Sequence, residues 1–265
     1  MTLELAYTET GEGPALVILH GLFGSSRNWA SIARRLGETH RVFTVDLRNH
    51  GASPWAETMD YGEMAEDVHA FLARHGLAGA AVMGHSMGGK TAMRLALEHG
   101  PDVGRLIVVD IAPVAYSHTH LPFVEAMRAV DLTAVGRRAD VDRQLETAIP
   151  EAALRGFLLH NLATDDGRLN WRINLAALAA NMDALIGYPE DQAGLAYGGP
   201  AHFIAGAASD YVLEAHHARI RDFFPKAEID SIPDAGHWVH AEQPAAFLER
   251  VRSILGIAEQ QIPES

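Results

Sequence analysis

The sequence predicts an α/β fold with a mostly parallel central sheet, flanking helices and an inserted helical cap. Three observations predict it: short runs of branched apolar residues alternate with longer amphipathic stretches, one long segment lacks such runs, and the alternation then resumes. The chain has 265 residues, of which 48% are hydrophobic, so it can bury a full-sized core. We expect a core domain at 1–113 and 198–257, a cap at 114–197 and a C-terminal tail at 258–265.

Short apolar runs are predicted as buried strands, because a strand covered on both faces has no need of alternating polar residues. These runs are ALVIL (15–19), RVFTVD (41–46), GAAVMG (79–84), RLIVVD (105–110), AHFIAG (201–206) and AEIDSI (227–232). The earlier stretch LELAYTET at 3–10 is predicted as a hairpin-like edge strand.

Helices are predicted where apolar residues recur every three or four positions, as on a helix that covers a sheet. These stretches are 27–36, 62–75, 87–99, 214–223 and 243–255. The segment at 114–197 contains helical patterns such as LPFVEAMRAV and WRINLAALAANMDALIG, but no convincing strand. Ligands bind outside the carboxyl ends of the strands in open parallel sheets, so a helical insertion there would cover the ligand site. A separate helical domain is the less favoured alternative, because the α/β pattern resumes afterwards.

Composition argues against several classes of function. The chain contains no cysteine, which excludes disulfides, thiolate nucleophiles and cysteine-ligated metals. Its formal net charge of -13 has the wrong sign for attraction to nucleic acid or to an anionic membrane surface. Fifteen histidines occur without the spacing of a known metal motif, so we expect no metal site.

Targeting and membrane segments are not expected. No apolar stretch approaches the roughly 18 residues that a membrane span needs, and MTLELAYTET lacks a basic segment followed by an apolar one. We therefore expect a soluble, cytoplasmic protein that binds neither nucleic acid nor membrane. The sequence does not predict the oligomeric state.

The segment GHSMG at 84–88 joins a predicted strand to a predicted helix and contains Ser86. A serine on such a tight turn adopts strained backbone angles, and glycines two residues away remove the Cβ atoms that would clash. Ser86 is therefore a candidate nucleophile. An ordinary turn serine is the competing interpretation, because glycine and serine are common in turns. Only partners elsewhere in the chain can decide between them.

The loop HGLFGSSRNW at 20–29 follows the predicted strand at 15–19. His20 and Gly21 would let the backbone turn, so that the amide of Leu22 points to the place where an oxyanion forms. The amide of Met87, after the candidate nucleophile, would be the second donor, and Phe23 is the alternative to Leu22. A glycine-rich loop that caps a helix remains the competing interpretation.

The segment PDAGHWVHAEQP at 233–244 follows the last predicted strand and supplies a candidate base. A Gly-His step at this place lets His237 reach over the edge of the sheet, where Nε2 can take the proton from the serine Oγ. His85 and His240 compete for the role. Both are better explained by packing, since His85 should point away from Ser86 and His240 falls on the following helical turn.

An acid must orient the base, and two carboxylates stand after predicted strands. Asp110 follows RLIVV and Asp210 follows HFIAGAAS. Either gives the chain order of serine, acid and histidine that this kind of fold requires. The residues alone leave both candidates open.

Together these motifs resemble the α/β-hydrolase fold family over nearly the whole chain. The matching segments are the HG loop, DLRNHGAS at 46–53, the GHSMG turn, the cap and the terminal AGHW. HGLFGSSRNW, VDLRNHGASP, GHSMGGK, DIAPV and AGHWVHAEQP are most similar to the YbfF-type branch of bacterial esterases and thioesterases. The resemblance implies a serine hydrolase that needs no cofactor and acts on small-molecule esters or acyl thioesters, with short to medium acyl chains.

The resemblance also bears on the acid. Most of the family places it in a pattern like G-x-x-D-x-x-V, and residues 206–212 here read GAASDYV. Ser209 takes the usual place of the acid, and Asp210 comes one residue late, which redirects its side chain. Some branches place the acid at the end of the preceding strand, where Asp110 lies. We therefore expect Asp110, with Asp210 as the alternative.

Other residues receive more modest expectations. Phe23, Trp171 and Trp238 are candidate substrate-binding residues. The polar residues at 46–50 are expected to hold loops together near the site, and Lys90 is expected to be solvated or ion-paired. Alternative functions on the same fold are haloperoxidase, lyase or carbon-carbon hydrolase chemistry, or ligand binding without catalysis.

Overall fold

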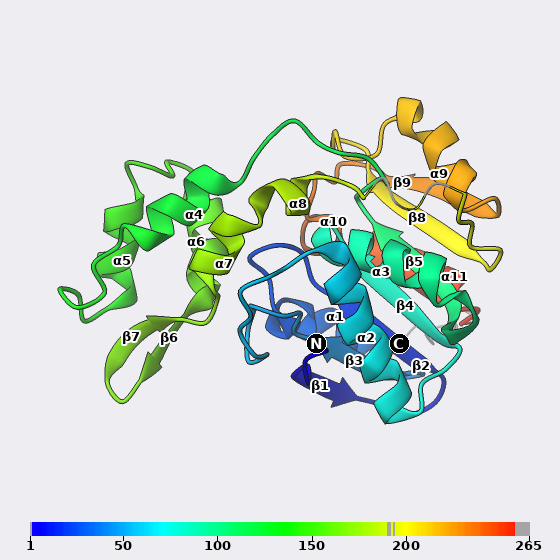
Figure 1. The fold of residues 1–265 in the computed structure, drawn as a ribbon, viewed down its shortest axis with the longest axis horizontal. Coiled ribbons are helices and arrows are strands. Elements are labelled where there is room, and N and C mark those ends of the chain that lie inside the picture. Colours follow the sequence, from blue (N-terminus) through cyan, green and yellow to red (C-terminus); the bar gives the residue numbers. More distant parts are fainter. Residues whose placement is uncertain (1, 190–191, 193, 258–265) are drawn as a thin grey trace, which may run out of the picture.

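The protein is described here by a computed structural model that covers residues 2–189, 192 and 194–257. The predicted tail at 258–265 lies outside the described residues. A seven-stranded sheet in the order β1-β3-β2-β4-β5-β8-β9 forms the centre (Figure 1). Its strands are β1 (Tyr7–Thr10), β2 (Ala15–Leu19), β3 (Arg41–Val45), β4 (Ala80–His85), β5 (Val103–Val109), β8 (Ala201–Gly206) and β9 (Ala227–Ile232).

Neighbouring strands run parallel except for β1 and β3, which are antiparallel. The predicted α/β fold with a mostly parallel sheet is confirmed. The edge strand exists, but it forms no hairpin with β2. Both edges of β2 are already paired, with β3 and β4, so β1 adds to the free edge of β3 instead.

Helices cover both faces of the sheet, as the apolar periodicity predicts. Leu16 and Ile18 pack on the side of α1 and α11, whereas Val17 and Leu19 pack on the side of α2 and α3. Successive residues of β2 therefore enter different cores, which is why the strand is apolar throughout. The core helices are α1 (Ala30–Leu36), α2 (Tyr61–His75), α3 (Met87–Glu98), α9 (His217–Phe223), α10 (Val239–Glu242) and α11 (Pro244–Ile254), with the short 3-10 turns η1 (Ser26–Trp29), η2 (Gly100–Asp102) and η5 (Glu214–His216).

Between β5 and β8 the chain forms a separate group of elements, which projects to one side of the sheet (green to yellow-green in Figure 1). They are α4 (Leu121–Arg128), α5 (Arg138–Leu145), α6 (Ala152–Leu158), η3 (Leu159–Asn161), β6 (Leu162–Asp165), β7 (Arg168–Trp171), α7 (Leu175–Ala180) and α8 (Met182–Ile186). We call this group the inserted segment.

The expectation that the inserted segment lacks strands is wrong, because β6 and β7 form an antiparallel hairpin. Asp166 and Gly167 make its turn, and both have positive φ, of 50° and 75°. An Asp-Gly pair between alternating residues is a strong hairpin signal, so the sequence did contain the information. The helical patterns on either side masked it.

Chain segments that carry the candidate site residues all follow strands on the same edge of the sheet. Ser86 comes directly after β4 and Asp110 directly after β5. Ser209 and His237 lie in the loops after β8 and β9. Within the described residues, no helix has the length and apolar character that crossing a membrane would require.

Candidate active site

Ser86 lies on a sharp turn between β4 and α3, with φ 52° and ψ -117°. Its neighbouring glycines make the turn possible. A Cβ on Gly84 would lie 2.1 Å from the carbonyl oxygen of Gly88, and a Cβ on Gly88 would lie 2.5 Å from that of Leu19. Only glycine fits at these two positions, which leaves the Ser86 hydroxyl on a strained, tightly packed turn.

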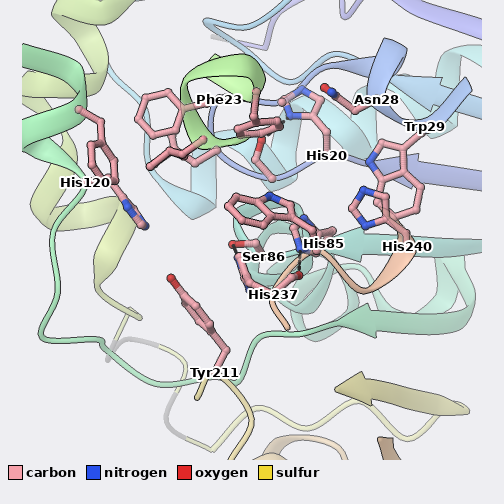
Figure 2. Close-up of a pocket in the computed structure, with 17 residues that line it drawn as sticks. His20, Phe23, Asn28, Trp29, His85, Ser86, His120, Tyr211, His237 and His240 are labelled. Carbon is pink, nitrogen blue, oxygen red and sulfur yellow. Dashed lines mark hydrogen bonds between the residues drawn. The ribbon is translucent and has the colours of Figure 1, made fainter. Parts of the chain in front are cut away.

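Ser86, His237 and Asp110 form a continuous chain of hydrogen bonds. Nε2 of His237 lies 3.0 Å from Oγ of Ser86, and Nδ1 lies 2.8 Å from Oδ2 of Asp110 (Figure 2). A carboxylate can only accept, so Nδ1 must carry the proton. Nε2 is then free to accept the proton of the serine hydroxyl, which is the protonation state that a general base requires.

The carboxylate of Asp110 is fully buried, and every bond that it makes fixes its orientation. Oδ1 accepts a hydrogen bond of 2.8 Å from the amide of Gly206, at the end of β8. Oδ2 accepts from the hydroxyl of Ser209 as well as from His237. Asp110 itself has a φ of 49°, so its backbone is also in the left-handed region.

Asp210, the alternative acid, is exposed and makes no hydrogen bond or ion pair with any residue that the structure describes. Its neighbour Ser209 points to the site instead and donates to Asp110. The residue at the position expected for the acid therefore contributes a hydroxyl to the carboxylate of another strand. The sequence alone does not predict this partnership, although Ser209 stands there at the position where the family pattern has an acid.

Two further side chains hold the ring of His237. The ring of Tyr211 stacks on it, with centroids 4.0 Å apart and an angle of 21°. His85 approaches from another side, where its Nε2 lies 2.8 Å from the carbonyl oxygen of His237 and therefore donates to it. Burial, followed by the neighbouring His237 and His240, lowers the pKa of His85 well below its usual value, so its ring stays neutral. As predicted, His85 packs beside the site rather than acting on Ser86.

The loop with the predicted oxyanion donor is held by His20. Nε2 of His20 accepts a 3.0 Å hydrogen bond from the amide of Leu47, so Nδ1 carries the proton and donates to the carbonyl of Gly21 at 2.8 Å. The amide of Gly24 donates to the same carbonyl. Because C=O and N–H point in opposite directions across a trans peptide, the Leu22 amide faces away from these partners. Gly21 packs against Ser86, since a Cβ there would lie 3.3 Å from that of the serine.

Phe23, the alternative donor, also has a structural role. Its φ is 61°, and its carbonyl accepts a 2.8 Å hydrogen bond from Nδ2 of Asn161 in the inserted segment. This bond joins the inserted segment to the loop beside Ser86.

Two pockets in the described part of the chain are lined by Ser86, and a third hollow adjoins the first of them. The main pocket, of about 210 Å³, is lined by Ser86 and His237 together with Phe23, His120, Phe157 and Trp238. Figure 2 shows Phe23 and His120 on one side of Ser86, and Trp29 and His240 on the other. The inner pocket, of about 30 Å³, is lined by Leu22, Ser86, Met87, Lys90 and Leu185 among others.

The third hollow, which we call the outer groove, has a volume of about 670 Å³. It shares Asn28, Phe157, Trp238 and His240 with the main pocket and so continues it outward. Of the predicted substrate-binding residues, Phe23 and Trp238 line the main pocket. Trp171 lies on β7, where it pairs with Leu162, and lines none of these three hollows.

The prediction for Lys90 is wrong, because its side chain is 1% exposed and has no carboxylate partner among the described residues. Its ammonium group donates to the carbonyl oxygens of Ile186, at 3.2 Å, and Gly187, at 2.5 Å, at the end of α8. The ring of Tyr116 lies 4.8 Å away. Burial lowers the pKa of Lys90 to about 7. Nothing in its local sequence distinguishes it from a solvated lysine.

The polar cluster after β3 ties loops together, as expected from the sequence. Asp46 accepts from the amides of Ser26, at 2.6 Å, and Ala52, at 2.9 Å. Asn49 is joined to Asn174 of the inserted segment by a backbone hydrogen bond of 2.9 Å. None of the residues at 46–50 lines the main pocket.

A metal site near the candidate residues is not apparent in the described part of the chain. The one group of potential ligands found there consists of Glu66, His69 and His99 and lies away from Ser86, on α2 and at the end of α3. The hydrogen-bonded serine, histidine and aspartate can perform nucleophilic acyl transfer, because the serine has a base and the base has an orienting acid.

Comparisons with known proteins agree with the fold. A family model described as "alpha/beta hydrolase fold" matches residues 14–244. The sn-1-specific diacylglycerol lipase ABHD11 of Mus musculus is 43% identical over 250 residues, covering 91% of this chain and 81% of the relative. Esterase YbfF of Escherichia coli is 36% identical, covering 91% and 92%. A solved structure titled "Marine microorganism esterase" has a TM-score of 0.91 and 38% identity, covering 95% of this chain and 99% of that one.

Proposed function

Because the chain belongs to the α/β-hydrolase fold family, we propose that it is a serine hydrolase that cleaves carboxylic esters through an acyl-enzyme intermediate. Hydrolysis of ester bonds is supported by the relatives that are named esterase and lipase. The observation that carries the mechanism is the hydrogen-bonded chain from Ser86 through His237 to the buried Asp110. Acyl thioesters could be cleaved by the same route.

In the proposed first half-reaction, Oγ of Ser86 attacks the acyl carbon while Nε2 of His237 takes the hydroxyl proton. The positive charge that forms on the imidazole is stabilised by the carboxylate of Asp110. The bond to the leaving oxygen then breaks, and Nε2 gives its proton to that oxygen. In the second half-reaction a water molecule loses a proton to Nε2 of His237, and its oxygen attacks the acyl carbon. The bond between that carbon and Oγ of Ser86 then breaks, Nε2 returns the proton to Oγ, and the carboxylic acid leaves.

The negative charge of each tetrahedral intermediate requires donors, and we assign them to the amides of Leu22 and Met87. Met87 is the first residue of α3, where the N–H groups of a helix are free to bind an anion. The carbonyl of Gly21 is held by His20 and Gly24, which supports the assignment of the Leu22 amide. Donors of this kind each contribute about 3 to 4 kcal/mol to transition-state stabilisation.

The two pockets beside Ser86 suggest how a substrate divides between them. Leu22 and Met87 both line the inner pocket, whose volume of about 30 Å³ has room for a short acyl group. The leaving group must lie within reach of His237, which lines the main pocket and not the inner one. We therefore assign the acyl group to the inner pocket and the leaving group to the main pocket.

We also propose that the inserted segment, predicted as a cap at 114–197, closes the site. His120, Phe123, Leu154 and Phe157 from this segment line the main pocket opposite the residues of the core. Phe123, Leu154 and Phe157 give this wall an apolar surface, which would shield the acyl-enzyme from bulk water.

A series of 4-nitrophenyl esters tests the proposal. We expect the acetate ester to have a higher kcat/KM than the octanoate ester, because the inner pocket holds only a short chain. Ser86→Ala should lower kcat for the acetate ester at least about a thousandfold, while circular dichroism shows an intact fold. Turnover that survives in Ser86→Ala would contradict the mechanism, and a preference for octanoate would contradict only the acyl assignment.

A further inference from the structure

We propose that the outer groove is a subsite for a phosphate-bearing leaving group, held by Arg27 and Arg138. The inference rests on the proposed ester hydrolysis and extends it, because it names the chemistry of the alcohol or thiol that departs.

The position of His237 sets this direction. Its Nε2 must protonate the leaving atom, so the leaving group lies in the main pocket, which His237 lines. Asn28 and His240 mark the side of this pocket that lies away from His120 (Figure 2). Both residues also line the outer groove, so a leaving group longer than the main pocket would continue into it.

The outer groove carries two arginines without acidic partners. Arg27 comes from η1 and Arg138 from α5, and both line the groove. Neither forms an ion pair with a carboxylate in the part of the chain that the structure describes. Two arginines of different elements therefore face one hollow with their charges unneutralised.

Arg138 is held in place by neutral groups only. Its guanidinium donates to the carbonyl oxygens of Leu159, at 2.9 Å, and Gly156, at 3.1 Å. These bonds use two of its five N–H groups, so donors remain for an anion. His160, another residue of the groove, lies close to this charge. Burial and, as a second cause, the charge of Arg138 lower the pKa of His160.

One acidic residue, Glu242, also lines the groove, but its carboxylate is already occupied. One of its oxygens accepts from the amide of Gly236 at 2.6 Å, and the other accepts from the amide of Trp238 at 3.1 Å. These amides fix the carboxylate on the loop that carries His237. The two arginines thus remain in excess over the single acidic group.

The ligand chemistry follows from this charge and from the shape of the guanidinium group. The formal net charge of the whole chain is -13, so an anion gains no general attraction and needs a local cationic site. Guanidinium groups bind phosphate oxygens in pairs of parallel hydrogen bonds. Phe157 and Trp238 add apolar surface between the arginines and Ser86, which suits a leaving group with a carbon chain before its phosphate.

Two matched pairs of substrates test the proposal. One consists of 3-hydroxypropyl acetate and 3-acetoxypropyl phosphate, and the other of S-acetylpantetheine and S-acetylphosphopantetheine. Within each pair only the phosphate differs, so the ratio of the two kcat/KM values isolates its contribution. We expect the ratio of phosphorylated to neutral substrate to be about three to ten in at least one pair.

In the double variant Arg27→Gln/Arg138→Gln this ratio should fall to about one. The control Arg168→Gln/Arg221→Gln makes the same change in net charge at two exposed positions outside the groove, and should keep the wild-type ratio. The single variant Arg27→Glu provides a second test if the double variant folds poorly, because the Arg27 side chain makes no hydrogen bond or ion pair with a described residue. It should bring the ratio to one or below.

The two pairs separate the sources of the phosphate. A ratio above one only for the oxygen ester would support phosphorylated alcohols, and one only for the thioester would support phosphopantetheine carriers. Ratios of one in both pairs, or a raised ratio that persists in the double variant, would overturn the subsite while the neutral esters still demonstrate hydrolysis. Failure to hydrolyse any neutral member would overturn the proposed function and the subsite with it.

Discussion

Ser209 donates its hydroxyl hydrogen bond to Oδ2 of Asp110, the same oxygen that accepts from Nδ1 of His237. In the sequence, Ser209 stands where the family pattern places an acid. In the structure it supports an acid that follows another strand. The hydroxyl donates to one lone pair of a fully buried carboxylate. Without it, that lone pair would have no hydrogen-bond donor.

Removal of this hydroxyl should therefore weaken catalysis without abolishing it. We expect Ser209→Ala to lower kcat for 4-nitrophenyl acetate about tenfold, which corresponds to the loss of about one hydrogen bond to a charged group. Ser209→Thr keeps the hydroxyl and should retain most of the activity. A wild-type kcat in Ser209→Ala would show that the bond does not support the acid.

The choice of acid is tested by a pair of isosteric variants. Asp110→Asn should lower kcat by about three to four orders of magnitude, since an amide at this position favours the wrong tautomer of His237. Asp210→Asn changes an exposed side chain without a described partner and should remain near wild type. Steady-state kinetics of both variants with the same ester decides between them, and the reverse result would assign the acid to Asp210.

Gly88, two residues after Ser86, should be essential to the fold of the turn. Gly88→Ala would place a Cβ 2.5 Å from the carbonyl oxygen of Leu19, so we expect a lower midpoint of thermal unfolding and a loss of activity. Gly156 in α6 is the matched control, because a Cβ there meets nothing within 4 Å. Gly156→Ala should raise stability by up to about 1 kcal/mol, since alanine favours a helix. Equal effects of both variants would contradict the close contact.

Lys90 should give the stability of the protein a distinctive pH dependence. Burial lowers its pKa from the ordinary value of 10.5 to about 7. Between these two values the unfolded chain binds the proton and the folded protein does not, so stability rises with pH over this window. Below pH 7 the buried ammonium carries its full desolvation cost, and the contribution levels off.

The comparison with Lys90→Met isolates this contribution. We expect the free energy of unfolding of the wild type, minus that of the variant, to increase from pH 7 to pH 9, at most by about 1.4 kcal/mol per pH unit. Urea denaturation at several pH values measures it. A difference that stays constant or falls over this range would mean that the folded protein keeps Lys90 charged.

The sheet could be predicted from the sequence almost residue by residue. Strands buried on both faces appear as uninterrupted apolar runs, and the predicted ranges 15–19, 201–206 and 227–232 coincide with β2, β8 and β9. The hairpin of β6 and β7 is not predicted despite its Asp-Gly turn, because helical patterns flank it and its two short strands carry little apolar surface. The pairing of β1 with β3 depends on which strand edges are free, which no single segment reveals.

For the candidate site, Ser86 and His237 could be named because each stands in a short motif whose glycines have a steric purpose. The bonds of Ser209 and Asp110 could not be derived in this way, since they join loops after different strands. Burial of Lys90 was equally hidden, because the groups that cover it, Ile186 and Gly187, come from the inserted segment. These contacts arise only when distant segments meet.

Labelling with a fluorophosphonate tests the central claim, that Ser86 is a nucleophile activated by His237. Peptide mass spectrometry of the labelled protein should find one adduct, on Ser86. Ser86→Ala should give no adduct, and His237→Ala should be labelled far more slowly. An adduct on another serine that persists in Ser86→Ala, or the absence of any adduct on the folded wild-type protein, would contradict the account.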